Sequence, residues 1–161
     1  MRVVSFRFLV GSLVLLLAAA GPLAAEEATV EGTWVLDAKA SRNVPEAQKG
    51  VDLRIGVRDD TVTISRHTGE ITIGEPLVVK LDNVERAQGI AGARSTMKAK
   101  WLEKGKKFEL VVSMPEPGSV FIAVQSVVTE VSPSGGTLTR TYNTRRAKEK
   151  EYRLLVYRRK P

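Results

Sequence analysis

The chain has no cysteine and only one histidine among its 161 residues. Without cysteine it has no disulfide framework, no thiol nucleophile and no cysteine-ligated zinc site. A single histidine excludes metal sites built on several imidazoles. Aromatic residues make up only 6% of the chain, so it offers few platforms for stacked nucleic-acid bases and no evident ligand set for haem. We therefore expect no metal, no cofactor and no nucleic-acid partner.

The chain also lacks an apolar run long enough to span a bilayer. The longest run, Phe8–Ala20, has about 13 residues, whereas a transmembrane helix needs roughly 20. Two arginines precede the run and the small residues of Leu23–Ala25 follow it, which is the layout of a secretory signal peptide. We expect cleavage after Ala25, and a single periplasmic or secreted domain of residues 26–161 that is not an integral membrane protein. An uncleaved N-terminal anchor is the alternative.

The rest of the chain alternates apolar and polar residues with a period of two, which is typical of half-buried strands. Short turns separate the segments, among them Asp59-Asp60, Glu103–Lys106 and Ser132–Gly136. One short helical turn is expected within residues 41–49. The expected strands are residues 51–58, 61–65, 77–82, 96–101, 108–112, 119–131, 137–141 and 151–159.

Many short antiparallel strands leave exposed edges unless the sheet closes on itself. The segment 119–131 is apolar on both faces, but its β-branched residues favour a strand over a buried helix. The sequence therefore predicts an all-β fold: an antiparallel up-and-down β-barrel of about eight to ten strands. A β-sandwich, which removes the edges only in part, is the alternative.

Four short motifs occur in order along the expected domain. They are Gly32-Thr33-Trp34, Ala99-Lys100-Trp101, the turn Ser132–Thr139 and the closing Val156-Tyr157-Arg158-Arg159. Together they resemble the small exported lipocalin-like proteins of bacteria, within the lipocalin/calycin superfamily. The Thr-Asp-Tyr motif of classical lipocalin carriers is absent, so the resemblance is to the broader lipocalin-like group.

The resemblance implies a lipocalin-like β-barrel with a defined base. Its first tryptophan, here Trp34, closes the base, and an arginine of the last strand packs across the indole ring. In such a contact the indole supplies a large buried apolar surface, and the guanidinium over its face adds a cation–π attraction. Arg158 matches that arginine best, and Arg153 is the alternative.

A barrel of about eight strands has an interior that side chains fill or that one small ligand occupies. We expect this barrel to bind a small apolar or amphipathic ligand, and a merely packed interior is the alternative. The residues expected to line the interior are Leu53, Ile55, Val57, Val62, Ile64, Leu77, Val79, Met97, Phe108, Leu110, Ile122 and Val124.

Positive charge is concentrated at the C-terminus. The formal charge of the chain is +7, yet residues 26–139 hold 14 basic and 16 acidic side chains, and residues 140–161 hold nine and two. A cationic hairpin suits an anionic ligand group or an anionic membrane surface. The residues expected to make that contact are Arg140, Arg145, Arg146 and Lys148. The alternatives are a solvated hairpin that only deters edge pairing and a hairpin that binds an envelope protein or an acidic glycan.

Catalytic motifs are scarce. His67 lies in an expected turn with Glu70 three residues on, and this pair is the one candidate for general base catalysis. No Gly-x-Ser-x-Gly nucleophile motif occurs. We therefore predict a binding protein rather than an enzyme.

Overall fold

A computed structural model describes residues 28–90, 93–116, 122–147 and 149–161, with the backbone alone for residues 88–90, 93 and 94. The expected signal peptide lies outside these residues and stays a prediction. Within the described ranges, no helix combines the length and the apolar character needed to cross a bilayer.

The described chain is all-β, with eleven strands and one short 3-10 helix. The strands are β1 (Gly32–Leu36), β2 (Asp52–Arg58), β3 (Thr61–Thr68), β4 (Ile71–Thr72), β5 (Leu77–Lys80), β6 (Arg86–Ile90), β7 (Ala93–Glu103), β8 (Lys107–Pro115), β9 (Ile122–Val131), β10 (Thr137–Arg145) and β11 (Lys150–Arg159), with the helix η1 (Glu46–Gln48) between β1 and β2. All strand pairs are antiparallel, and most neighbours in the sheet are neighbours in sequence. The predicted all-β, up-and-down order is confirmed.

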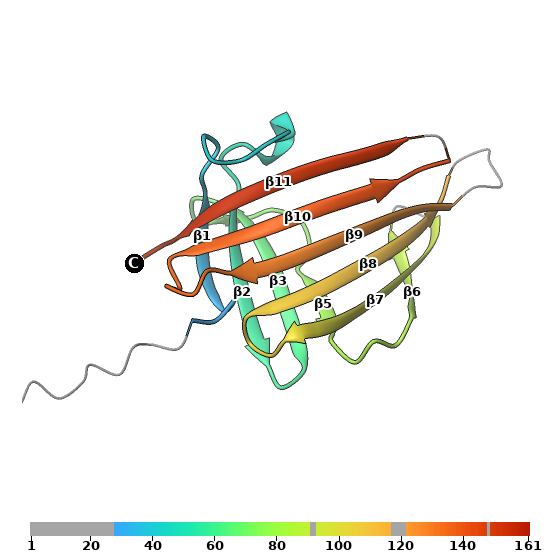
Figure 1. Ribbon diagram of the computed structural model, residues 1–161, viewed down its shortest axis with the longest axis horizontal. Coiled ribbons are helices and arrows are strands. Elements are labelled where there is room, and N and C mark those ends of the chain that lie inside the picture. Colours follow the sequence, from blue (N-terminus) through green and yellow to red (C-terminus); the bar gives the residue numbers. More distant parts are fainter. Residues whose placement is uncertain (1–27, 91–92, 117–121, 148) are drawn as a thin grey trace, which may run out of the picture.

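Two groups of strands face each other across the interior. Figure 1 shows β7 to β11 side by side as one layer of long strands, crossing β1, β2, β3 and β5 behind them. The pairing of β1 with β11 joins the two layers into one sheet. The expected turns are found at Asp59, with φ 54°, and at Gly105, with φ 75°, where a left-handed backbone reverses the chain.

The two end strands of the sheet order, β4 and β6, do not pair with each other in the described residues. A single bridge, from Asp82 after β5 to Lys100 of β7, links the two layers on this side, and beside it the Asn83 N–H donates to the Ala99 carbonyl at 2.7 Å. After β5 the Asp82 carboxylate accepts hydrogen bonds from the Arg86 guanidinium and the Val84 N–H. These bonds stabilise a turn in which the chain leaves the β-sheet. A continuously hydrogen-bonded barrel, as the sequence predicted, is therefore not seen in this part of the chain.

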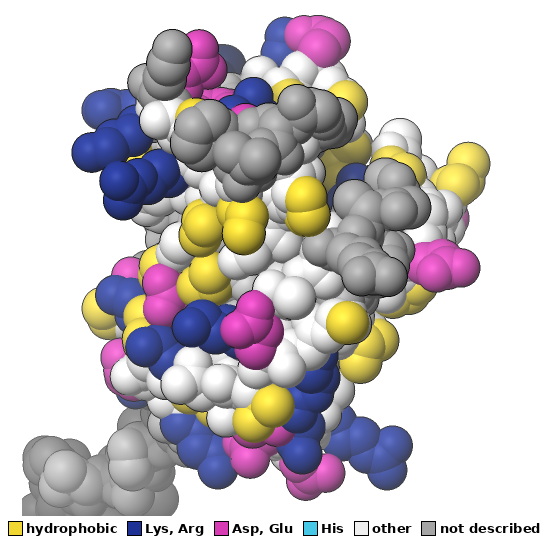
Figure 2. Space-filling model, turned by 90° about the vertical axis from the view of Figure 1, so that its right-hand side faces the viewer, with side chains coloured by type: hydrophobic (Ala, Val, Ile, Leu, Met, Phe, Trp, Pro, Cys, Tyr) yellow, Lys and Arg dark blue, Asp and Glu magenta, His cyan; other side chains and the backbone are white. Residues whose placement is uncertain are grey.

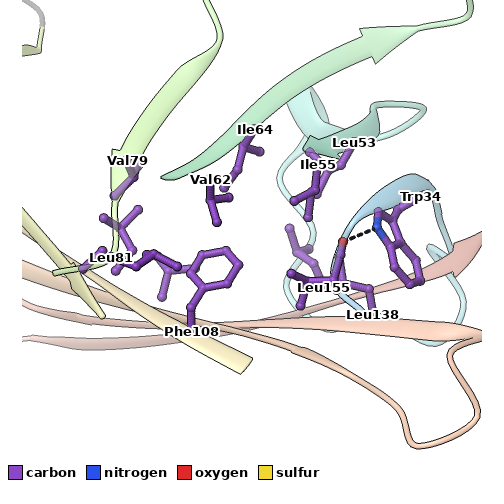
Figure 3. Close-up of a cluster of buried hydrophobic side chains, with 14 of the residues drawn as sticks. Trp34, Leu53, Ile55, Val62, Ile64, Val79, Leu81, Phe108, Leu138 and Leu155 are labelled. Carbon is purple, nitrogen blue, oxygen red and sulfur yellow. Dashed lines mark hydrogen bonds between the residues drawn. The ribbon is translucent and has the colours of Figure 1, made fainter. Parts of the chain in front are cut away.

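The interior is a packed apolar core at one end, which we call the base. Figure 3 shows Ile55, Val62 and Ile64 pointing from β2 and β3 toward Phe108 and the strands of the other layer. Their cross-strand register, with Ile55 opposite Ile64, places alternate residues on this inner face. Burial of these side chains supplies the main stabilisation of the fold.

Trp34 closes the base, and Arg159 rather than Arg158 packs on it. The indole is fully buried, its Nε1–H donates to the Val30 carbonyl at 2.9 Å (Figure 3), and the Arg159 guanidinium carbon lies 4.4 Å from the ring centroid. Trp34 stands directly opposite Arg159 in the β1–β11 ladder, so both face inward. Arg158 therefore points outward, where it pairs with Asp37 at 3.2 Å, and Arg153 lies over Tyr142 instead.

Two of the expected lining residues lie on the outer face. Ile122 and Val124 are 59% and 37% exposed. In β9 it is the odd-numbered residues that face inward, because Val127 stands opposite the inward-facing Leu110 and Tyr142. The prediction chose the wrong face, since a strand that is apolar on both faces does not reveal its register.

Candidate functional site: a pocket around Arg140

The interior contains a cavity of about 250 Å³ beside the packed core. We call the end of the molecule away from Trp34, where the β8–β9 and β10–β11 hairpins project, the open end. The cavity lies between β2, β3 and the turn after β4 on one side and β10 and β11 on the other. Its walls are Gln48, Val51, Leu53, Ile64, Arg66, Glu75, Leu77, Arg140, Tyr142 and Tyr157. The side formed by β2, β3 and the turn after β4 carries four apolar side chains together with Gln48, Arg66 and Glu75, and the side formed by β10 and β11 carries Arg140 and two tyrosines. Apolar and charged surfaces therefore meet in this pocket, which suits an amphipathic ligand.

Arg140 is the buried charge of this pocket. It is only 8% exposed, because the inner face of β10 runs through Leu138, Arg140 and Tyr142, with alternate residues pointing inward. Its guanidinium carbon lies 5.3 Å from the centre of the Tyr142 ring, and that of Arg153 lies 5.4 Å from the same ring. Cation–π contacts of this kind hold both guanidinium groups in place.

The charge on Arg140 has no carboxylate partner among the described residues. Its Nε–H is buried and makes no hydrogen bond there, and the same is true of the hydroxyl of Thr129, which stands directly opposite Arg140 on β9. A buried cation without a partner is unfavourable. Because Arg140 also lines the pocket, its unpaired guanidinium indicates a place that an anionic group can fill.

Tyr157 adds a hydroxyl to the same wall. Burial raises the pKa of Tyr157, and the Arg140 guanidinium beside it offsets only part of this rise. The phenol therefore stays protonated at neutral pH and can donate a hydrogen bond. Arg140 and Tyr157 both line the pocket and together can supply a charge and a hydrogen-bond donor to an anionic group.

The structure divides the predicted lining residues into three groups. Leu53, Ile64 and Leu77 line the pocket. The others on the inner face belong to the packed core or pack against it, and Ile122 and Val124 lie outside. The core group comprises Ile55, Val57, Val62, Val79, Met97, Phe108 and Leu110. Their part in ligand binding stays a prediction.

The four predicted anion contacts do not form one cluster. Arg140 lines the pocket, whereas Arg145 and Arg146 are exposed at the end of the β10–β11 hairpin. Lys148 lies outside the described residues. The basic C-terminal segment therefore provides one buried charge and a separate exposed group.

Six residues line the pocket without having been predicted from the sequence: Gln48, Val51, Arg66, Glu75, Tyr142 and Tyr157. Tyr142 could have been found, because it follows Arg140 by two positions and so shares its face of the strand. Gln48 and Glu75 come from η1 and from the turn after β4, and no local pattern places them at the pocket.

His67 is not paired with Glu70. Its Nε2 lies 2.9 Å from the Ser65 hydroxyl and its Nδ1 lies 3.4 Å from the Thr72 hydroxyl, while Glu70 lies near Arg54. The proposed acid–base pair is therefore not formed. The described ranges contain no group of three or more acidic, histidine or cysteine side chains that could hold a metal ion.

No protein-family model and no curated protein sequence matches this chain. Solved structures do match in fold. A secretory abundant heat soluble protein from Ramazzottius varieornatus matches with a TM-score of 0.55 at 17% identity, over 83% of this chain and 99% of that one. The REP1-NXSQ fatty acid transporter matches with a TM-score of 0.52 at 14% identity, over 81% and 96%.

A fatty acid binding protein from Schistosoma mansoni, solved with arachidonic acid, also matches, with a TM-score of 0.52 at 16% identity, over 81% and 96% of the two chains. At these identities the matches show the fold alone. The chain has a calycin-like fold, of the kind found in these proteins. The predicted lipocalin-like resemblance is thus confirmed at the level of the fold, and membership of the lipocalin/calycin superfamily and of the narrower group stays a prediction.

Proposed function

We propose that this protein binds a small amphipathic carboxylate, with the head group at Arg140 and the apolar part against Leu53, Ile64 and Leu77. The observation that carries the proposal is the buried guanidinium that lacks an anionic partner within the described chain. The fold is consistent with it, since two of the matching solved structures are named for fatty acid transport or binding. The proposed role is binding without catalysis.

The size of the pocket supports a compact ligand. Its volume of about 250 Å³ lies below the roughly 300–1,000 Å³ of typical ligand sites. The space toward the base is occupied by core side chains such as Phe108 and Leu138. We therefore propose a medium-length acyl chain or an aromatic acid rather than a long fatty acid.

Calorimetric titration of the protein with decanoate tests the proposal. Arg140→Met should weaken binding about tenfold or more, because a charge-assisted hydrogen bond contributes about 1.5–3 kcal/mol. Arg158→Met is the matched control, since Arg158 is an exposed arginine of the neighbouring strand, and it should bind as the unmodified protein does. Equal affinities for all three proteins, or no heat of binding at millimolar decanoate, would overturn the proposal.

The stability of Arg140→Met separates a ligand contact from a structural one. An arginine kept for stability leaves a destabilised protein when it is removed, whereas a buried, uncompensated charge can be replaced by an apolar side chain with little loss or a gain. We expect the urea midpoint of Arg140→Met to equal or exceed that of the unmodified protein.

We further propose that residues 1–25 direct export to the periplasm or the medium, on the basis of the sequence pattern alone. N-terminal sequencing of the protein from its native cells tests this. A first residue of Glu26 supports export with cleavage, and a retained Met1 would contradict it.

A further inference from the structure

The hairpins β8–β9 and β10–β11 end next to each other at the open end of the molecule, where Figure 1 shows them projecting to the same side. Val124 of β9 stands opposite Ser113 of β8 and Arg145 of β10, and Arg145 stands opposite Lys150 of β11. A continuous row of side chains therefore crosses the four strands on their outer face. The tip surface, as we call it, consists of Ile122, Val124, Arg145, Arg146, Lys150 and Tyr152.

The cations of the tip surface lack acidic partners in the described part of the chain. Arg145 and Lys150 are directly opposed across the hairpin, and like charges in that position destabilise a ladder. Neither they nor Arg146 take part in an ion pair with a described residue. Glu151 is bound to Arg153 at 2.9 Å. An external anion between Arg145 and Lys150 would remove the repulsion.

A hollow of about 410 Å³ lies at this place, which is enough for a phosphate group. Its walls are Asn143, Thr144, Arg145, Lys150, Glu151 and Tyr152. Arg145, Lys150, the Asn143 amide and the Tyr152 hydroxyl can donate hydrogen bonds to phosphate oxygens. The hollow is separate from the pocket around Arg140, with which it shares no wall residue.

Apolar side chains adjoin these cations. Ile122, Val124 and Tyr152 are all exposed, and Figure 2, which looks onto the open end, shows hydrophobic side chains close to a corner where Lys and Arg gather. Single exposed apolar residues are ordinary. Cations, aliphatic side chains and a tyrosine together on a projecting end are typical of a surface that enters a lipid headgroup layer.

We propose that the tip surface docks the protein on an anionic lipid bilayer. Arg145 and Lys150 bind lipid phosphates in the hollow, and Ile122 and Val124 enter the boundary between headgroups and acyl chains. The docking is independent of the pocket around Arg140. The exposed aliphatic pair favours a bilayer over a soluble acidic polymer, which would bind the cations but leave these side chains in water.

Vesicle binding tests the proposal. The protein should bind vesicles that contain phosphatidylglycerol and not those of phosphatidylcholine alone, with an affinity that falls as salt rises. The double variant Arg145→Gln/Arg146→Gln should lower the partition coefficient about 30-fold. Ile122→Ser should lower it about fivefold at every salt concentration.

The matched control is Arg58→Gln/Lys104→Gln, which removes the same charge from two exposed cations at the β2–β3 and β7–β8 turns. It should bind vesicles as the unmodified protein does, and thermal unfolding should show that both double variants remain folded. An equal loss of vesicle binding in the control would show that net charge alone causes the effect, and would overturn the proposal. Absence of vesicle binding, or full competition by millimolar glycerol phosphate, which would indicate a site for free phosphate, would also overturn it.

Discussion

Removal of Arg159 is expected to destabilise the protein strongly, because this side chain joins three segments at the base. Its Nε–H donates to the Gly135 carbonyl at 2.7 Å, and its two terminal nitrogens donate to the carbonyls of Glu31 and Thr29 at 2.9 and 2.6 Å. The guanidinium also covers the ring of Trp34. Arg159→Met removes all four interactions but keeps most of the apolar stem.

The magnitude follows from the burial of these bonds. Two of the three are partly buried, and a hydrogen bond to a charged group contributes about 1.5–3 kcal/mol. The cation–π contact adds about 1 kcal/mol. Because water can replace part of what is lost, we expect a net loss of about 3 kcal/mol in the free energy of unfolding, a large share of the roughly 5–15 kcal/mol of a typical domain.

Urea unfolding measures this loss. At a slope of about 2 kcal/mol per molar, the midpoint should fall by about 1.5 M. Arg158→Met is the matched control: its side chain is 61% exposed and pairs only with surface groups, so it should cost less than about 1 kcal/mol. If Arg158→Met were the more destabilising of the two, the register of β1 on β11 would be wrong by one residue.

Three further predictions concern the pocket, the first strand and the turn at Asp82 after β5. Leu77→Trp should fill the pocket and abolish decanoate binding in calorimetry, whereas Val78→Trp, on the exposed face of the same strand, should not; equal binding by both would place the ligand elsewhere. Gly32→Ala should lower the thermal midpoint, at a cost of about 2 kcal/mol, because φ is 137° and a new Cβ would lie 2.8 Å from Arg159; an unchanged midpoint would contradict this. The Arg86 guanidinium holds the pKa of Asp82 well below its usual value, so the urea midpoints of the unmodified protein and Asp82→Asn should differ at pH 6, and this difference should shrink progressively as the pH falls from about 4 toward about 2; a difference that stays constant over this range would refute this.

The strands could be predicted wherever one face of a strand is apolar. In β2 and β3 the alternation specifies both the strands and the inward residues, such as Ile55 and Ile64. β6 (Arg86–Ile90) was missed because it lacks alternating apolar residues and forms by pairing with β7. Closure of the barrel could not be judged from sequence, because it depends on how the chain leaves β5 at Asp82.

Register limited the prediction of individual side chains. Arg158 and Arg159 are adjacent and chemically identical, and only the pairing of β1 with β11 decides which one meets Trp34. For the same reason β9 was assigned the wrong inner face. Unknown register also limited the prediction of the pocket. The sequence identified Arg140 as a candidate anion contact but could not show that it is buried while Arg145 lies at the surface.

A crystal structure of the protein with decanoate tests the central claim most directly. We predict that the carboxylate lies within hydrogen-bond distance of the Arg140 guanidinium and the Tyr157 hydroxyl, with the acyl chain against Leu53 and Leu77. A carboxylate bound at the hairpin cations instead, or an interior without decanoate at saturating concentration, would contradict the account.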